Sequence, residues 1–163
     1  MLFIFDLDQT LVDSNKASGL RKNRQWSKVY SMIPELMPFC GVNDFLSTLN
    51  RRGAEIAIVT SSPRPYCERI ISYWGWTINI TVCYHDTRKH KPDPEPILLA
   101  LQKSRCSAEK TFAVGDTPGD IIAANRAGVL SVAALWGSDQ WDELLAANPG
   151  VVCQTVSDLC FLI

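Results

Sequence analysis

Short apolar runs alternate with helical stretches along almost the whole chain, and this alternation constrains the fold more than any other feature. Five of the runs are rich in valine and isoleucine: 2–5, 55–59, 78–84, 112–114 and 129–135. Strands that are buried on both faces are apolar on successive residues, which is typical of a parallel sheet. Helices are expected between them at 43–52, 65–74, 94–103, 119–127 and 139–147, with a last short strand at 151–154. The alternation predicts an α/β protein with a three-layer, doubly wound parallel sheet.

One segment, residues 14–38, interrupts this alternation. It is too long for a simple strand-to-helix turn and too short for a large second domain. We therefore expect a single domain over residues 1–163, in which 14–38 forms a small helical insert above the strand ends. The insert carries five basic residues before its first acid, Glu35: Lys16, Arg21, Lys22, Arg24 and Lys28. This basic face is either a solvated helix surface or a landing surface for an anionic substrate. Trp26 and Tyr30 would either stack on a ring of the substrate or pack the insert onto the core.

The composition argues against a membrane protein and against a nucleic-acid-binding protein. The formal net charge of the 163 residues is −1, and no apolar run approaches the ~20 residues that a membrane span needs. The six cysteines are scattered, without a Cys-x-x-Cys pair. This spacing favours buried thiols in a reducing compartment over a disulfide framework. The expected location is the cytoplasm.

Polar side chains follow the predicted strands at the points where the strands end. Asp6 and Asp8 come directly after the first strand. Ligands of open parallel sheets bind beyond the carboxyl ends of the strands, so residues at these points are expected to meet. The others follow the second, third and fourth strands: Thr60, Ser61, Lys91, Asp116 and Asp120.

This set of side chains suits phosphoryl transfer. A phosphate ester is an anion, so a carboxylate nucleophile needs a cation that neutralises both groups. Mg²⁺ prefers oxygen ligands, and Asp6 and Asp116 would supply two of them. Lys91 would neutralise a phosphoryl oxygen, and Thr60 would donate a hydrogen bond to another. Asp8, two residues after Asp6, would stand near the leaving oxygen and exchange a proton with it.

The same residues resemble the four motifs of the haloacid dehalogenase superfamily. Residues 5–14 resemble its first motif, with the sequence FDLDQTLVDS. Thr60, Lys91 and residues 115–120 (GDTPGD) resemble its second, third and fourth motifs, in the family order. Three further stretches resemble the phosphoglycolate-phosphatase-like branch: 38–42 (PFCGV), 91–96 (KPDPEP) and 123–128 (AANRAG).

The resemblance implies a role for each matching position. Asp6 would be the nucleophile that forms an aspartyl phosphate. Asp8 would be the general acid and base, and its backbone carbonyl would bind Mg²⁺. Asp116 would complete the protein ligands of the ion, and Asp120 would lie just outside them or bind through water. Three residues would hold the phosphoryl group: Thr60, Ser61 and Lys91.

The sequence therefore predicts a Mg²⁺-dependent phosphatase on a Rossmann-like fold, which hydrolyses a phosphate monoester through a phosphoaspartate. The expected partner is a phosphorylated small molecule, with a phosphorylated macromolecule as the alternative. Two other functions stay open: a phosphomutase on the same core, and a non-catalytic phosphate-binding or regulatory module. The identity of the substrate is not encoded in the motifs.

Several positions carry a second interpretation or depart from the family pattern. The family usually has glycine after the second aspartate of its first motif, where this chain has Gln9, and it usually has a larger helical cap than 14–38. Asp120 would alternatively be only the N-cap of a helix that begins at residue 121. Arg64 would bind substrate or cap a helix. Three residues would form a metal site or, as we expect, a loop beside the active site: His85, Asp86 and His90.

Overall fold

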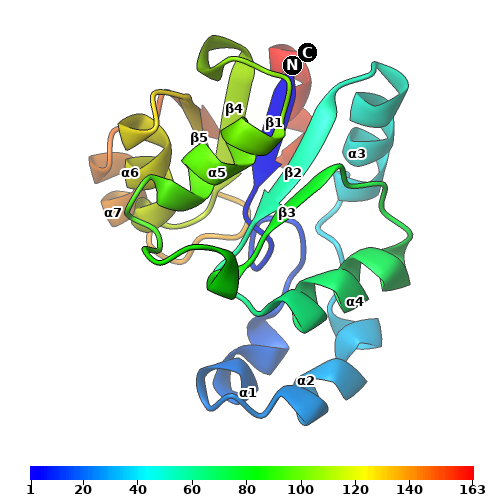
Figure 1. The fold of residues 1–163 in the computed structure, drawn as a ribbon. Coiled ribbons are helices and arrows are strands. Elements are labelled where there is room, and N and C mark those ends of the chain that lie inside the picture. Colours follow the sequence, from blue (N-terminus) through cyan, green and yellow to red (C-terminus); the bar gives the residue numbers. More distant parts are fainter.

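The computed structural model describes all residues 1–163 and is built around one six-stranded sheet (Figure 1). Every pair of neighbouring strands is parallel. The strands lie in the order β3-β2-β1-β4-β5-β6, so the chain reverses its direction across the sheet between β3 and β4. They are β1 (Leu2–Phe5), β2 (Glu55–Val59), β3 (Ile80–Val82), β4 (Thr111–Gly115), β5 (Leu130–Ala134) and β6 (Val151–Cys153). The predicted doubly wound parallel sheet is confirmed.

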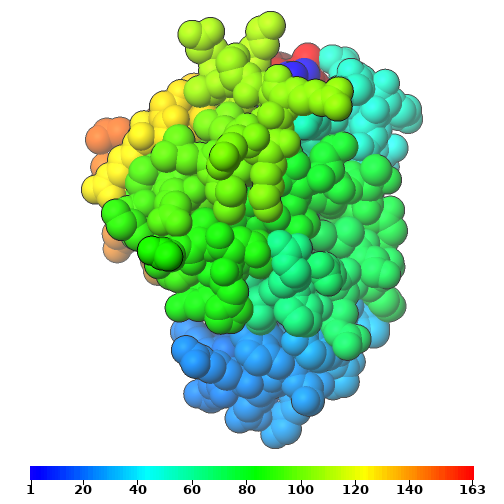
Figure 2. Space-filling view, viewed as in Figure 1, coloured from blue at the N-terminus to red at the C-terminus, as the bar shows by residue number.

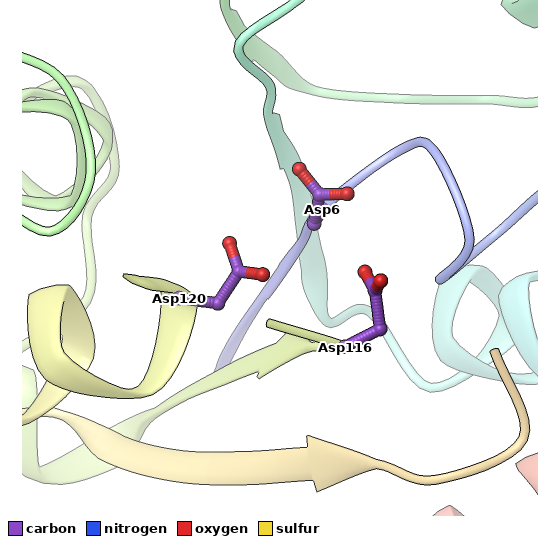
Figure 3. A group of neighbouring side chains, drawn as sticks. All are labelled: Asp6, Asp116 and Asp120. Atoms are coloured by element: carbon purple, nitrogen blue, oxygen red, sulfur yellow. The ribbon is translucent and has the colours of Figure 1, made fainter. Parts of the chain in front are cut away.

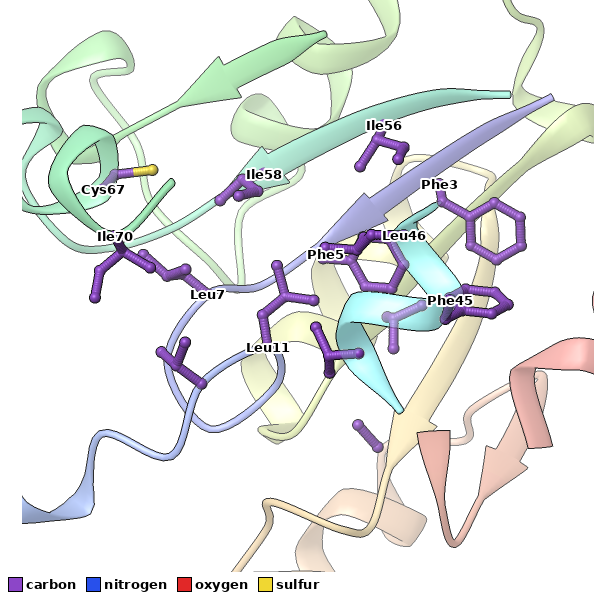
Figure 4. Packing of buried hydrophobic residues seen from close by; sticks show 14 of the residues in the cluster. Phe3, Phe5, Leu7, Leu11, Phe45, Leu46, Ile56, Ile58, Cys67 and Ile70 are labelled. Atoms are coloured by element: carbon purple, nitrogen blue, oxygen red, sulfur yellow. The ribbon is translucent and has the colours of Figure 1, made fainter. Parts of the chain in front are cut away.

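Helices cover both faces of this sheet, so the protein has three layers. They are α3 (Val42–Arg51), α4 (Arg64–Trp74), α5 (Glu95–Lys103), α6 (Pro118–Arg126) and α7 (Trp141–Ala146). Phe3 and Phe5 of β1 pack with α3 and α4 in the larger core cluster, part of which Figure 4 shows. Leu2 and Ile4 point to the other face and pack with α5 and α6. Because side chains alternate between the faces of a strand, a strand covered on both sides is apolar throughout.

The insert lies beyond the carboxyl ends of the strands, as predicted, and forms the blue segment below the sheet in Figure 1. It consists of η1 (Asn15–Ala17), α1 (Ser18–Lys22), α2 (Trp26–Ser31) and η2 (Ile33–Glu35). Val29 and Ile33 are buried in the larger core cluster. The ring of Trp26 lies 5.7 Å from that of Tyr66 on α4, and the Arg69 guanidinium lies 4.6 Å above the ring of Tyr30. Trp26 and Tyr30 therefore pack the insert onto the core.

The predicted helices and strands are all present, and their ends differ from the prediction by at most two residues. The third strand is shorter than predicted at both ends. Its carboxyl end stops because the Asp86 carboxylate accepts a hydrogen bond of 2.7 Å from the Cys83 N–H, which turns the chain into the 3₁₀ helix η3 (Tyr84–Asp86). Sequence analysis missed the 3₁₀ helix η5 (Val156–Leu162), which buries Val156 and Leu159 in the core. None of the helices combines the length and apolar character needed to cross a bilayer.

Candidate active site

Three carboxylates converge at the carboxyl ends of two adjacent strands (Figure 3). Asp6 follows β1, Asp116 follows β4, and Asp120 lies in the first turn of α6. The Asp6 N–H donates to the Val114 carbonyl at 2.9 Å, which continues the pairing of β1 with β4 and holds the two strand ends side by side. One carboxylate oxygen from each aspartate lies within 4.8 Å of the other two. The structure thus brings together Asp6 and the two acids that the sequence placed after another strand, Asp116 and Asp120.

Hydroxyl groups fix the orientation of two of these acids. Thr10 donates to Asp116 Oδ1 at 2.8 Å. Thr117 Oγ1 donates to Asp120 Oδ2 at 2.6 Å, and the Asp120 N–H donates back to the same hydroxyl at 3.3 Å. Thr117 is therefore the N-cap of α6 and Asp120 is the third helical residue of a capping box. The alternative that Asp120 is itself the N-cap was wrong: it holds the N-cap with one oxygen and faces the cluster with the other.

Lys91 lies between two of the carboxylates, and its side chain is only 9% exposed. Its Nζ donates to Asp6 Oδ1 at 2.6 Å, to Asp120 Oδ1 at 2.5 Å and to the Val59 carbonyl at 3.0 Å. Burial lowers the pKa of Lys91, but the charges of Asp120 and Asp6 outweigh burial, so its pKa is raised above the usual value. The amine is therefore a fixed positive charge at the centre of the site.

One amine does not balance three carboxylates. Burial raises the pKa of Asp6 to about 7; Lys91 opposes this shift, and the charges of Asp120 and Asp8 add to it. Burial likewise raises the pKa of Asp116 to about 8, and the charges of Asp6 and Asp120 add to it. The ionised cluster carries excess negative charge on carboxylate oxygens, which are the donors that Mg²⁺ prefers. The residues present therefore fit a divalent cation.

Asp8 lies outside this cluster and is held by donors from three parts of the chain. Its Oδ1 accepts a hydrogen bond of 2.8 Å from the Tyr66 hydroxyl. Its Oδ2 accepts one of 2.7 Å from Ser62 Oγ and forms an ion pair of 2.8 Å with the Arg21 guanidinium. Arg21 is anchored in turn, because it donates to Ser14 Oγ at 2.7 Å. The Asp8 carboxylate thus connects the strand end, α4 and the insert.

The sequence analysis missed two of these partners and noted the third, Arg21, only as one cation of a basic face. Ser62 stands next to the predicted Thr60 and Ser61, so its position was a usable signal. Tyr66 gave no signal, because only the packing of α4 turns its hydroxyl toward Asp8. Burial and the Asp8 charge raise the pKa of Tyr66, which keeps the phenol neutral and able to donate.

The two predicted phosphate-binding residues after β2 lie in different surroundings. Thr60 is buried, and its Oγ1 accepts a hydrogen bond of 3.0 Å from the Ser62 N–H. The hydrogen of the Thr60 hydroxyl has no acceptor within the protein and stays free to donate. Ser61 is exposed and lines a groove beside the insert.

The other candidates suggested by the sequence serve the local structure. Arg64 donates to Asp86 Oδ2 at 2.6 Å and to Thr81 Oγ1 at 2.8 Å, which ties α4 to β3 and η3. Asp86 is thereby occupied by Arg64, and the histidines beside it do not join a cluster of metal-binding side chains. His85 and Asp86 lie in η3, and His90 lies in the loop that follows it.

Gln9 adopts a left-handed backbone with φ 66, where the family usually has glycine. Its side-chain oxygen, when turned toward the chain, accepts from the N–H groups of Ser14 and Asn15 at 3.0 and 2.9 Å. The backbone of Gly137 lies so close that a Cβ there would come within 1.5 Å of the Gln9 carbonyl oxygen. The two hydrogen bonds that the Gln9 side chain accepts at the start of the insert therefore offset the strain of its left-handed backbone.

Gln9→Ala and Gln9→Gly are both expected to lower the free energy of unfolding, and Gln9→Ala is expected to lower it more. Gln9→Ala keeps the left-handed strain and loses both hydrogen bonds, which should reduce the free energy of unfolding by about 2 kcal/mol. Gln9→Gly loses the same bonds but gains ~1 kcal/mol from relief of strain, for a net loss of about 1 kcal/mol. Urea unfolding measures both, with the exposed Gln102→Ala as control. A Gln9→Gly variant more stable than wild type would show that the hydrogen bonds contribute little.

The parallel sheet, with an acidic, lysine-bearing centre beyond β1 and β4, is that of a doubly wound α/β protein whose site lies at the carboxyl ends of its strands. The chain belongs to the haloacid dehalogenase-like hydrolase family, whose sequence pattern matches residues 20–134. It is 33% identical over 129 residues to a protein from Caldanaerobacter subterraneus that bears the name of a pyrophosphatase, PpaX, covering 78% of this chain and 56% of that one. It is 28% identical over 157 residues to a phosphoglycolate phosphatase from Shigella boydii, covering 94% of this chain and 62% of that one. The chain thus spans less than two thirds of either relative.

Solved structures with the same fold come from several bacteria. A hydrolase from Pseudomonas syringae superimposes with a TM-score of 0.81 at 22% identity, covering 98% of this chain and 95% of that one. CbbY from Rhodobacter sphaeroides, solved in complex with phosphate, superimposes with a TM-score of 0.83 at 14% identity, covering 97% and 95%. At these identities the likeness establishes the fold.

Proposed function

We propose that this protein is a Mg²⁺-dependent phosphatase that hydrolyses a phosphate monoester of a small molecule through a phosphoaspartate on Asp6. The observation that carries the proposal is the convergence of Asp6, Asp116 and Asp120, with Asp8 held beside them by its own set of donors. The phosphatase names of the relatives support the same reaction class. We further propose that residues 1–163 act as one domain, with 14–38 as a minimal cap over the site.

In the first half of the reaction, a carboxylate oxygen of Asp6 attacks phosphorus and the ester P–O bond breaks. Lys91 and the Thr60 hydroxyl bind phosphoryl oxygens and stabilise the charge that develops there. Ser61 is the third phosphate-binding residue. Protonated Asp8 gives its proton to the leaving oxygen, so the product departs as an alcohol.

In the second half, water attacks the phosphorus of the aspartyl phosphate. Asp8 removes a proton from the water, the bond between phosphorus and Asp6 breaks, and inorganic phosphate leaves. The hydroxyls of Ser62 and Tyr66 can accept as well as donate hydrogen bonds, so they can hold Asp8 in both of its protonation states. Asp8 is thus positioned for proton transfer in both directions.

A magnesium ion would be held by Asp6, Asp116 and the Asp8 carbonyl, with Asp120 bound directly or through water. When bound, it would neutralise charge on the nucleophile and on the phosphoryl group. Burial is the main cause of the raised pKa values of Asp6 and Asp116, and neighbouring carboxylates add to it, so a bound cation would stabilise the charged forms that this site disfavours.

Release of phosphate from p-nitrophenyl phosphate should require Mg²⁺. We expect EDTA to reduce the rate to background and added Mg²⁺ to restore it, because the carboxylates repel the substrate anion without a cation. Mg²⁺ should also raise the melting temperature, since a ligand that binds the folded state stabilises it.

Asp116→Asn should lose most of this thermal shift, while the exposed Asp139→Asn should keep it. A full rate in EDTA would refute metal dependence. Rearrangement of a sugar phosphate without release of phosphate would indicate a phosphomutase, and binding without turnover would indicate a regulatory module.

A further inference from the structure

A groove of about 460 Å³ runs between the insert and the loops that follow β2 and β3. Figure 2 shows the insert (blue) packed against this green part of the surface. The volume falls in the range of small-molecule sites, roughly 300–1,000 Å³. No carboxylate lines the groove; its lining includes the basic side chains of Arg21, Lys22 and Arg24, the aromatic side chains of Trp26 and Tyr84, and the hydroxyl of Ser62.

The positive charges of the groove are only partly used within the protein. Arg21 is paired with Asp8 at 2.8 Å. Lys22 and Arg24 are exposed, and neither side chain forms an ion pair or hydrogen bond with another residue. Two cations facing a groove without carboxylates create a positive potential there. An anion in this groove would meet two charges that have no competing partner.

The groove adjoins the side of the site where the leaving group must lie. Two of its lining residues, Arg21 and Ser62, both contact Asp8 Oδ2. In the proposed reaction Asp8 protonates the leaving oxygen, so the rest of the leaving group extends from Asp8. The groove is the space that such a group would enter, and the aromatic side chains of Trp26 and Tyr84 offer contacts to its carbon skeleton.

We propose that the groove selects substrates whose leaving group carries a second anionic group, which Lys22 and Arg24 bind. This inference rests on the proposed function, because it takes the side of the leaving group from the role of Asp8. Lys22 and Arg24 are specificity-determining residues: they lie beyond the reacting atoms and act through charge.

Three substrates that differ only at the far end of a five-carbon chain test the proposal. They are pentyl phosphate, 5-(phosphonooxy)pentanoate and pentane-1,5-diol bisphosphate. We expect kcat/KM with Mg²⁺ to be about tenfold higher for the two substrates whose far end is anionic, because exposed ion pairs with Lys22 and Arg24 contribute modestly to binding. Comparison of the carboxylate with the bisphosphate shows which anionic group the groove prefers. The measured rate for the bisphosphate is divided by two, because either of its two equivalent ends can react.

In the Lys22→Gln/Arg24→Gln double variant, the ratio of kcat/KM for each substrate with an anionic far end to kcat/KM for pentyl phosphate should fall from about ten to about one. Lys28→Gln is the matched control, because Lys28 lies in the same insert, is exposed and does not line the groove. Equal use of all three substrates by wild type, or an unchanged preference in the double variant, would overturn the assignment of the groove.

Binding to the Asp6→Asn variant separates this inference from the phosphatase proposal. Calorimetry should find pentane-1,5-diol bisphosphate bound about tenfold more tightly than pentyl phosphate, and the difference should vanish when Lys22 and Arg24 are also replaced. Equal affinities would refute the groove as an anion site even if wild type hydrolyses both compounds. Selective binding without turnover in wild type would sustain the groove and refute the phosphatase.

Discussion

Replacement of Asp6 by asparagine is expected to reduce phosphate release at least ~10³-fold while the protein stays folded. The amide has nearly the shape of the carboxylate but is a poor nucleophile, and loss of a covalent nucleophile removes the reaction path that depends on it. Lys91 keeps its contacts with Asp120 and Val59, so its charge is not left alone. Because burial already disfavours the charged form of Asp6, we expect a melting temperature equal to or above that of wild type.

Kinetics of phosphate release and a thermal melt measure the two parts of this expectation. Asp139→Asn is the control, because the same chemical change at an exposed position should leave both quantities unchanged. Acid quenching of the wild-type enzyme during turnover, followed by mass spectrometry, should find phosphate on Asp6. A near-normal rate in Asp6→Asn would show that another group attacks phosphorus.

The second large effect is expected at Gly115, a residue without chemistry of its own. A Cβ at this position would lie 2.2 Å from the Asp120 Cβ and 2.4 Å from its Cγ. The Asp120 side chain cannot rotate away, because Thr117 and Lys91 hold its two oxygens. Gly115→Ala must therefore displace Asp120 and the start of α6. We expect a loss of about 1–3 kcal/mol in the free energy of unfolding from overpacking and, as site groups shift, a loss of ~10²-fold in kcat.

Urea unfolding and phosphate-release kinetics check both quantities. Gly19→Ala is the matched control, because its Cβ would meet no atom within 4 Å and the residue lies in helix α1. That change should raise stability by up to ~1 kcal/mol and leave the rate unchanged. If Gly115→Ala matched wild type in stability and rate, Asp120 would not be held as the structure describes.

The sequence predicted the sheet and the acidic centre because both depend on local pattern and simple topology. Each strand is recognisable from a run of apolar residues that must be buried on both faces. Parallel strands place their carboxyl ends at one edge, so Asp6 and Asp116 had to approach each other once β1 and β4 were neighbours. The η5 helix escaped prediction because a 3₁₀ segment with two buried residues has no clear period.

The surroundings of the acids were decided only by tertiary structure. Hydrogen bonds decide which residue caps α6, and the spacing of the sequence does not reveal them. The same holds for the hydrogen bonds that join the Gln9 side chain to the start of the insert. The partners of Asp8 come from segments up to 58 residues away, and α4 must pack before Tyr66 can reach it. The chain's sequence by itself thus determined the α/β sheet and the set of acids at its edge. The packing of insert against core determined which donors hold each acid and where the basic groove opens, because such contacts join residues that no local pattern relates.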